Sequence, residues 1–170
     1  YKKCLGIREE ALGEDHLLVA TSYLKVAQAL SDKGEFKQAM AECRTALIIQ
    51  ESISEENGVS LTETHILMGN ILSEQGEHEK AIASYNIALS IREEILRKKH
   101  PKVADSVTDI GVIKLKQGKF DEAESYHRKA LQIRETILGK EHADCAISYS
   151  NLGLVLSKNG DQDGGALVVL

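Results

Sequence analysis

Apolar and polar residues alternate along this chain with the period of an α-helix. Between positions 39 and 49 apolar residues recur at Ala39, Cys43, Ala46, Leu47 and Ile49, with steps of 4, 3, 1 and 2. These steps place the five side chains close to one face of a helix with about 3.6 residues per turn. The pattern therefore predicts amphipathic helices rather than strands.

The same arrangement returns every 42 residues. The glycines that share one position of the repeat are Gly34, Gly76, Gly118 and Gly160. Apolar positions coincide on the same period, for example Ala39, Ala81 and Ala123, and Ile7, Ile49, Ile91 and Ile133. A fixed period of roughly 20–50 residues is typical of a solenoid, in which each unit buries its apolar face only against its neighbours. Such a stack offers a long surface to a partner and does not naturally build one deep pocket.

The pattern within each unit predicts two helices, A and B, which meet at the repeated glycine. We expect helix A at 18–33, 60–75, 102–117 and 144–158, and helix B at 1–12, 36–54, 78–97 and 120–138. The glycine allows the positive φ with which the chain leaves helix A. Small residues at positions 27, 69, 111 and 153 should let two helix backbones approach closely.

The repeat resembles the tetratricopeptide (TPR) family. With Ala20 as the first position of a unit, Ala27 falls on the small eighth position, Ala39 on the twentieth and Ala46 on the twenty-seventh. The ordinary unit has about 34 residues, and the extra length here lies in helix B and the loop after it. The phrases at 7–16, 91–96 and 133–142 resemble the kinesin light chain type of TPR. Similar units occur in nephrocystin-like proteins and in the sensor arrays of nucleotide-binding receptor proteins.

The resemblance implies an all-α, right-handed superhelical solenoid. We expect a single array over 1–170: a terminal helix B at 1–12, full units at 18–54, 60–97 and 102–138, and a last helix A at 144–158. Residues 159–170 contain poor helix formers, so we expect a frayed or divergent end. Because the chain starts inside a unit, we expect it to be a fragment of a longer chain.

Composition narrows the classes of partner. The chain has 170 residues and a formal net charge of −5, whereas binding to nucleic acid needs clustered Lys and Arg. No apolar run approaches the roughly 18 residues of a membrane span. Three cysteines, Cys4, Cys43 and Cys145, stand far apart, which is typical of reduced intracellular thiols. We therefore expect a cytoplasmic protein that binds neither nucleic acid nor membrane.

Candidate chemistry is sparse. His16, His100 and His142 share one repeat position, so they lie on successive units about 10 Å apart. They cannot converge on one metal, whose ligands lie about 2 Å from it. We expect them to flank the next helix A, and we expect no metal, no cofactor and no catalytic residue. Arg8, Arg92 and Arg134 also recur at one position and should form local or inter-repeat ion pairs, while Cys43 should be an inert buried thiol.

The TPR resemblance also implies a binding surface. Helix A lines the concave face of TPR arrays, with its second, fifth, sixth, ninth and thirteenth positions toward the partner. At these positions we predict a partner-binding groove formed by Thr21, Leu24, Lys25, Gln28, Glu63, Ile66, Leu67, Asn70, Asp105, Thr108, Asp109, Val112 and Asn151. Its aliphatic members could instead pack under a neighbouring helix B. An apolar groove with a polar border is the usual platform for a peptide.

We therefore predict a non-catalytic scaffold for protein–protein interaction. The groove carries more acids than bases, which favours a basic peptide with apolar anchors. The resemblance implies a kinesin light chain-like cargo adaptor as one role. A sensor or autoinhibitory array within a larger nucleotide-binding signalling protein is the alternative, and an enzyme remains the third class.

Overall fold

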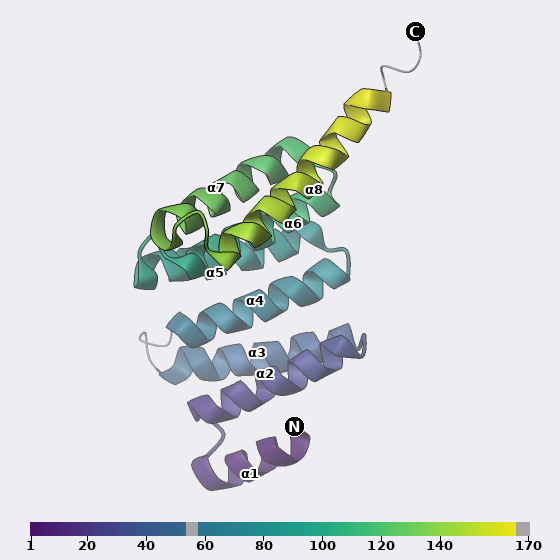
Figure 1. Cartoon of the computed structure of the whole chain (residues 1–170). Helices are drawn as coiled ribbons and strands as arrows, with labels where there is room; N and C mark the ends of the chain where they lie inside the picture. The colour runs from purple at the N-terminus through teal and green to yellow at the C-terminus, as the bar shows by residue number, and fades with distance from the viewer. Residues whose placement is uncertain (54–57, 166–170) are drawn as a thin grey trace. The chain divides into compact units, whose positions relative to one another are not determined.

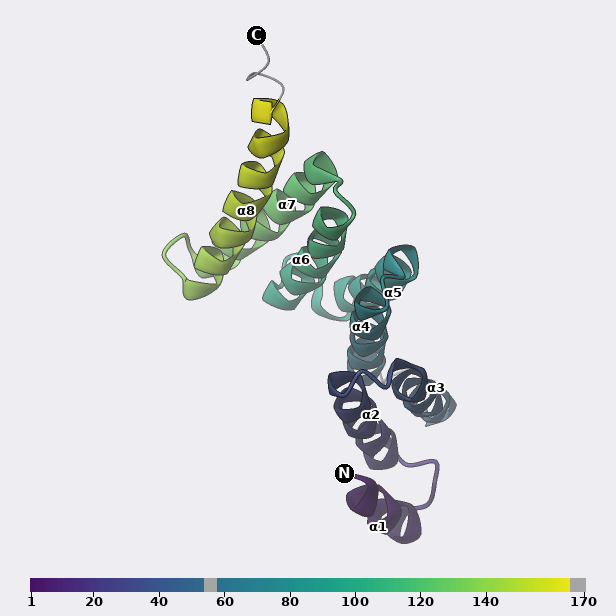
Figure 2. The same cartoon turned by 90° about the vertical axis from the view of Figure 1, so that its right-hand side faces the viewer.

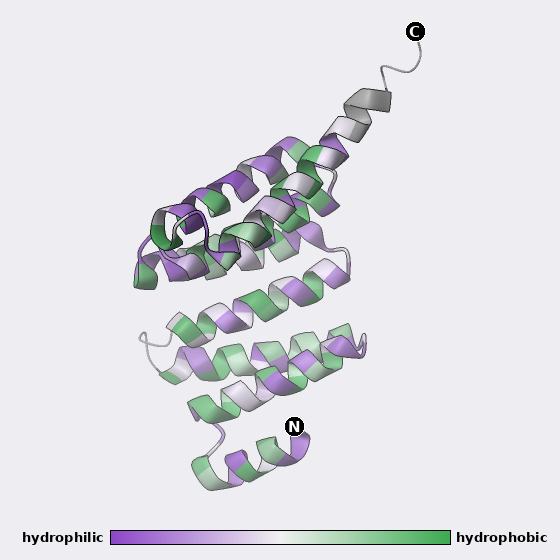
Figure 3. Cartoon of the chain, viewed as in Figure 1, coloured by the Kyte–Doolittle hydropathy of each residue, from purple (hydrophilic) through white to green (hydrophobic). Residues whose placement is uncertain are grey.

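The computed structural model describes residues 1–53 and 58–165, and this part of the chain contains eight α-helices and no strand (Figure 1). The helices are α1 (Lys2–Leu12), α2 (Leu17–Asp32), α3 (Phe36–Ile53), α4 (Gly58–Glu74), α5 (His78–Leu96), α6 (Pro101–Lys116), α7 (Phe120–Leu138) and α8 (Ala143–Gly165). Along each helix hydrophobic and hydrophilic residues alternate with the helical turn (Figure 3). The predicted all-α helical repeat fold is confirmed.

The chain forms two compact units, Tyr1–Ile91 and Arg92–Leu170. In the first unit α2 packs against α1, α3 and α4. In the second unit α7 packs against α6 and α8 (Figure 2). Each unit therefore builds its core from helices that are neighbours in sequence, as expected for a repeat protein. The single array over 1–170 stays a prediction.

Three of the four repeated glycines end a helix A with the same turn. Gly34, Gly76 and Gly118 have φ values of 78°, 76° and 73°. The amide of Glu35 donates to the carbonyl of Leu30 at 2.9 Å, and Gly34 donates to Ser31 at 2.8 Å. This is the pair of hydrogen bonds of a Schellman motif, and the same pair recurs around Gly76 and Gly118. The predicted role of these glycines is confirmed.

The fourth glycine does not end its helix. The prediction placed the end of the last helix A at 158, but α8 continues to Gly165, through Gly160. The earlier turns are followed by Phe36 and Phe120, which begin a returning helix B. The repeat position of the fully buried Ala39, Ala81 and Ala123 is occupied by Gly165. A helix that returned after a turn at Gly160 would therefore lack the side chain that packs helix B in the other repeats. Residues 166–170 of the predicted frayed end lie outside the described residues.

Histidine caps three of the helices. Nδ1 of His16 accepts a hydrogen bond from the amide of Leu18 at 3.1 Å, and His100 and His142 accept from the second helical amide in the same way. Each imidazole thereby satisfies one of the amides that an α-helix leaves unpaired at its start. The prediction that these histidines flank the next helix A is confirmed, and the structure adds the capping role.

A polar bridge links each helix B to the helix that follows. Its members lie 14 residues apart and are Arg8 with Ser22, Gln50 with Thr64, Arg92 with Ser106, and Arg134 with Ser148. Arg8 and Arg92 also donate to a backbone carbonyl of the next helix. The expectation of ion pairs was therefore wrong for Arg8 and Arg92, because hydroxyl and carbonyl groups occupy their guanidinium groups. Arg134 does form an ion pair, with Asp105.

Candidate functional site

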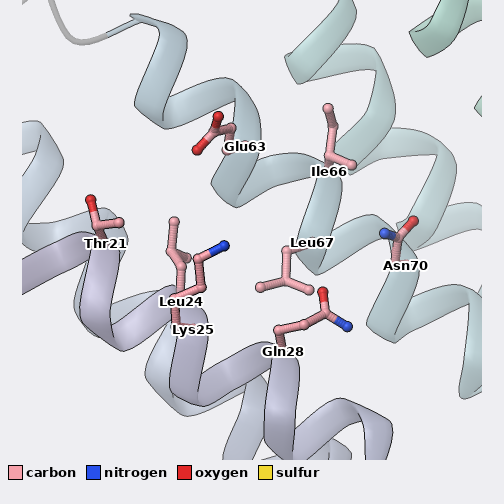
Figure 4. A pocket seen from close by; sticks show the side chains of 8 residues that line it. All are labelled: Thr21, Leu24, Lys25, Gln28, Glu63, Ile66, Leu67 and Asn70. Atoms are coloured by element: carbon pink, nitrogen blue, oxygen red, sulfur yellow. The ribbon is translucent and has the colours of Figure 1, made fainter. Parts of the chain in front are cut away.

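Eight of the thirteen predicted groove residues line one cavity of the first unit. Thr21, Leu24, Lys25 and Gln28 come from α2, and Glu63, Ile66, Leu67 and Asn70 come from α4 (Figure 4). The cavity has a volume of about 290 Å³. On each helix these residues are spaced by one, three or four positions, so they share one face. The stacking of α2 beside α4 brings the two faces together.

The floor of this cavity, which we call the α2–α4 groove, is aliphatic. Leu24 and Leu67 are 8 % and 7 % exposed and belong to the core of the first unit, while Ile66 is half-buried. Leu24 and Leu67 therefore pack in the core, which was the alternative for the aliphatic residues. They also line the cavity and form its floor. A floor fixed by core packing is rigid, and rigid sites lose little entropy when a ligand binds.

Hydrogen bonds within the protein orient two amide side chains at the border. Gln28 Nε2 donates to Asp32 Oδ1 at 2.8 Å, which leaves the Gln28 carbonyl as an acceptor. Asn70 Oδ1 accepts from the Tyr85 hydroxyl at 2.6 Å, which leaves the Asn70 amide as a donor. In Figure 4 that amide nitrogen lies on the side of Leu67. The groove thus offers one acceptor on α2 and one donor on α4, the pair that a peptide bond needs.

Opposite charges face this groove from its two walls. Lys25 stands on α2 and Glu63 on α4, and both side chains are exposed. Neither forms a salt bridge with another described residue, so both charges remain available to a ligand. The remaining predicted residues, Asp105, Thr108, Asp109, Val112 and Asn151, lie in the second unit.

Arg134 organises the predicted residues of the second unit. Its guanidinium is buried and donates to Asp105 Oδ1 at 2.6 Å, Thr108 Oγ1 at 3.2 Å and Ser148 Oγ at 2.5 Å. Asp105 stays 53 % exposed despite this ion pair. Val112 on α6 is exposed and Asn151 on α8 is half-buried, and neither joins this cluster. The structure therefore ties Asp105 and Thr108 together and leaves Val112 and Asn151 apart from them.

Among the predicted groove residues, Asp109 has the carboxyl group whose pKa the protein shifts most. Burial raises the pKa of its carboxyl from 3.8 to about 6. The nearby Asp105 carboxylate acts in the same direction, while Arg92 and Arg134 lower the pKa. Burial dominates because a half-buried carboxylate loses hydration that the two guanidinium groups, each bonded to other oxygens, replace only in part.

Sequence reasoning missed Tyr85, which orients Asn70. It predicted an ion pair for Arg134 but did not identify Asp105 as the partner. A signal for Arg134 was present, because Ser22, Thr64, Ser106 and Ser148 follow the recurring Arg or Gln at a constant distance. Tyr85 could have been found as the large helix B residue at the repeat position that faces Gly69.

The described residues show no metal centre. They contain no group of three or more His, Cys, Asp or Glu side chains that could hold an ion. Cys43 is fully buried, and burial raises the pKa of its thiol to about 12, so it stays protonated and unreactive at neutral pH. In the same part of the chain no helix has the length and apolar character that crossing a membrane requires.

Models of the tetratricopeptide repeat match residues 20–52, 59–135 and 105–163. The chain belongs to the tetratricopeptide repeat family. The predicted TPR array is therefore confirmed, and the family match runs through both units. TPR folds serve protein–protein interaction and are typically non-catalytic scaffolds that bind protein or peptide partners.

Solved structures of other TPR proteins resemble this one. BtubC (BKLC) from P. vanneervenii shares 26 % identity with a TM-score of 0.75, over 86 % of this chain and 58 % of that protein. A putative kinesin light chain with nearly identical TPR-like repeats from Podosopora anserina shares 20 % identity with a TM-score of 0.76, over 98 % of this chain and 80 % of that one. The apo form of RapI shares 20 % identity with a TM-score of 0.75, over 94 % of this chain and 42 % of RapI. No curated protein matches the chain.

These neighbours agree with the kinesin light chain type of TPR that the sequence phrases indicated. The Podosopora anserina protein carries a name of that type, and it aligns over 98 % of this chain. At 20 % identity it supports the fold and not a shared partner. The chain spans 58 % of the length of BtubC.

Proposed function

We propose that this TPR chain is a non-catalytic interaction module that binds a peptide segment of a partner protein in the α2–α4 groove. The observation that carries the proposal is the aliphatic floor of Leu24, Ile66 and Leu67 within a polar border. An extended peptide would place an apolar side chain on this floor. Its main chain would donate to the Gln28 carbonyl and accept from the Asn70 amide.

The preferred peptide carries apolar anchors and a few basic residues. Glu63 at the α2–α4 groove supports this preference, although Lys25 on the opposite wall offsets part of its charge. Exposed charges steer encounter and select partners more than they add affinity. The basic residue of the ligand should therefore meet Glu63, and its effect should weaken in salt.

Two biological roles would use such a groove. In a kinesin light chain-like cargo adaptor, the peptide belongs to another protein. In a sensor or autoinhibitory array of a larger nucleotide-binding signalling protein, the peptide belongs to the same polypeptide. The source of the peptides that the groove selects therefore separates the two roles.

A peptide screen followed by calorimetry tests the proposal. We expect selected peptides to bind the wild type and to lose about tenfold or more in affinity on Leu67→Asp, which charges the floor. Because Leu67 is part of the core, folding of that variant must be verified by circular dichroism. Asn70→Ala provides a second variant, at an exposed position, that removes the donor of the border together with the acceptor of the Tyr85 hydroxyl.

A matched pair of charge variants tests the basic preference. Glu63→Lys should weaken a basic ligand, whereas Glu10→Lys makes the same charge change on exposed α1 and should not. Asp105→Lys is avoided because it would leave the buried Arg134 guanidinium without its carboxylate partner. The basic preference would be contradicted if the peptides whose binding depends on Leu67 were mainly acidic, or if the two charge variants had equal effects. Binding that survives both Leu67→Asp and Asn70→Ala would contradict the groove itself.

A further inference from the structure

A second cavity lies on the other side of α4 within the first unit. Its volume is about 490 Å³, and α3, α4 and the first turn of α5 contribute to its walls. On α4 it is lined by Met68 and Leu72, each two positions from a residue of the α2–α4 groove, Ile66 and Asn70. Two positions correspond to about 200° around a helix. The second cavity and the groove therefore use opposite faces of the same helix.

The interior of this second cavity is apolar and built from adaptable side chains. Met40 is buried, while Phe36, Met68 and Leu72 are half-buried against the core. The chain has only two methionines, and both lie here. Methionine is unbranched and polarisable, so it fits apolar anchors of different shapes. This composition suits a docking surface better than a fully packed interior would.

The rim of the second cavity is positively charged. Lys37, Arg44 and Lys80 surround the opening together with one acid, Glu77, which pairs with Lys80. Lys37 and Arg44 are exposed and form no salt bridge with any residue that the structure describes. The rim therefore keeps two uncompensated positive charges in a chain whose net charge is −5. A positively charged rim would repel a basic ligand and attract an acidic one.

We propose that the second cavity binds a peptide segment of a partner protein in which a bulky apolar side chain is flanked by aspartate or glutamate. The apolar side chain would fill the space between Phe36, Met40 and Met68. The flanking carboxylates would meet Lys37 and Arg44, which complement their charge. The apolar interior distinguishes this ligand from nucleic acid, which would use the cations and leave the floor empty. The inference stands independently of the α2–α4 groove.

Methyl NMR locates the binding directly. The probe is a synthetic peptide with one phenylalanine between two short runs of glutamate and aspartate. With ¹³C-methyl methionine labelling, Met40 and Met68 give two reporter signals, and both should shift and saturate as the peptide is added. Peptide binding with both signals unmoved would overturn the proposal. Signals that shift with protein concentration alone would also overturn it, because the occupant would then be a second copy.

Matched variants test the chemistry of the site. The double variant Lys37→Glu and Arg44→Glu should weaken the acidic peptide by about tenfold or more. The control, Lys129→Glu and Lys140→Glu, makes the same charge change at exposed positions of the second unit and should leave affinity within about twofold. Equal losses in the two variants would overturn the proposal, because they would indicate only general attraction. Replacing the phenylalanine of the peptide by alanine should also abolish the methyl shifts, and unchanged binding would refute the apolar anchor.

Discussion

At the scale of single residues, size complementarity between helices decides where side chains fit. A Cβ added to Gly69 would lie 2.6 Å from the Tyr85 ring, and one added to Gly111 would lie 3.0 Å from the His127 ring. In the repeat at 18–54 the equivalent pair is Ala27 with Cys43, and both are fully buried. Where the residue on helix B is larger, the residue on helix A is glycine.

Two identical substitutions should therefore have opposite effects on stability. Gly69→Ala should lower the free energy of unfolding by about 1–3 kcal/mol, because the Tyr85 ring must move. Gly153→Ala should raise it by about 0.5–1 kcal/mol, since nothing lies within 4 Å of the added Cβ and alanine favours a helix over glycine. Urea denaturation of both variants measures the difference. Destabilisation of equal size would contradict this packing.

Asp109 should make stability depend on pH. Its folded-state pKa of about 6 exceeds the ordinary carboxyl value of 3.8. The folded chain therefore binds the proton more tightly and loses stability as the pH rises from about 4 to about 6. Asp109→Asn should therefore be more stable than the wild type above pH 6 by up to about 2 kcal/mol, with no difference near pH 4. Denaturation across this range tests it. Wild type and Asp109→Asn whose stabilities changed in parallel over this range would refute the assignment.

At the scale of elements, local patterns predicted the helices because each signal is contained in the helix that it describes. The glycine turns at 34, 76 and 118 needed only a residue that tolerates positive φ. Gly160 shows the limit of this reasoning, because a turn forms only if the returning segment gains packing. The bridges of Arg8 and Arg92 were missed for a related reason: their partners, Ser22 and Ser106, lie on another helix.

For the groove, too, the sequence predicted which residues share a face but not the contacts between helices. Repeat position placed eight of its predicted residues on two faces that meet across α2 and α4. It could not show that Arg134 neutralises Asp105 or that Tyr85 turns the Asn70 amide toward the groove. These contacts depend on distances between helices, which a one-dimensional period does not contain.

The histidine cap of α6 should be replaceable by asparagine and not by alanine. His100 accepts from the Lys102 amide and precedes Pro101 at the first helical position. His100→Ala removes the acceptor and should cost about 0.5–2 kcal/mol. His100→Asn supplies another acceptor and should restore wild-type stability. Thermal melts compare the three proteins, and equal melting of alanine and asparagine variants would mean that the cap contributes nothing.

At the scale of the whole molecule, a stack of helices exposes more than one surface of each helix to partners. In the first unit α4 contributes Ile66 and Asn70 to the groove and Met68 and Leu72 to the second cavity. Because its own backbone hydrogen bonds and the core residue Leu67 hold α4 in place, occupation of one face need not move the other. A scaffold with this arrangement can hold two ligands of opposite charge at once.

We therefore expect the acidic and basic peptides to bind together without competing. Calorimetric titration of the acidic phenylalanine peptide should give the same affinity, within about twofold, with and without a saturating basic groove peptide. Glu63→Lys should then affect only the basic peptide, and the Lys37→Glu and Arg44→Glu double variant only the acidic one. Mutual attraction of the two peptides in solution is excluded by a titration without protein. A loss of affinity of tenfold or more in the presence of the other peptide would mean that both compete for one site, because two sites on opposite faces of a rigid helix share no contact through which binding at one could so weaken the other.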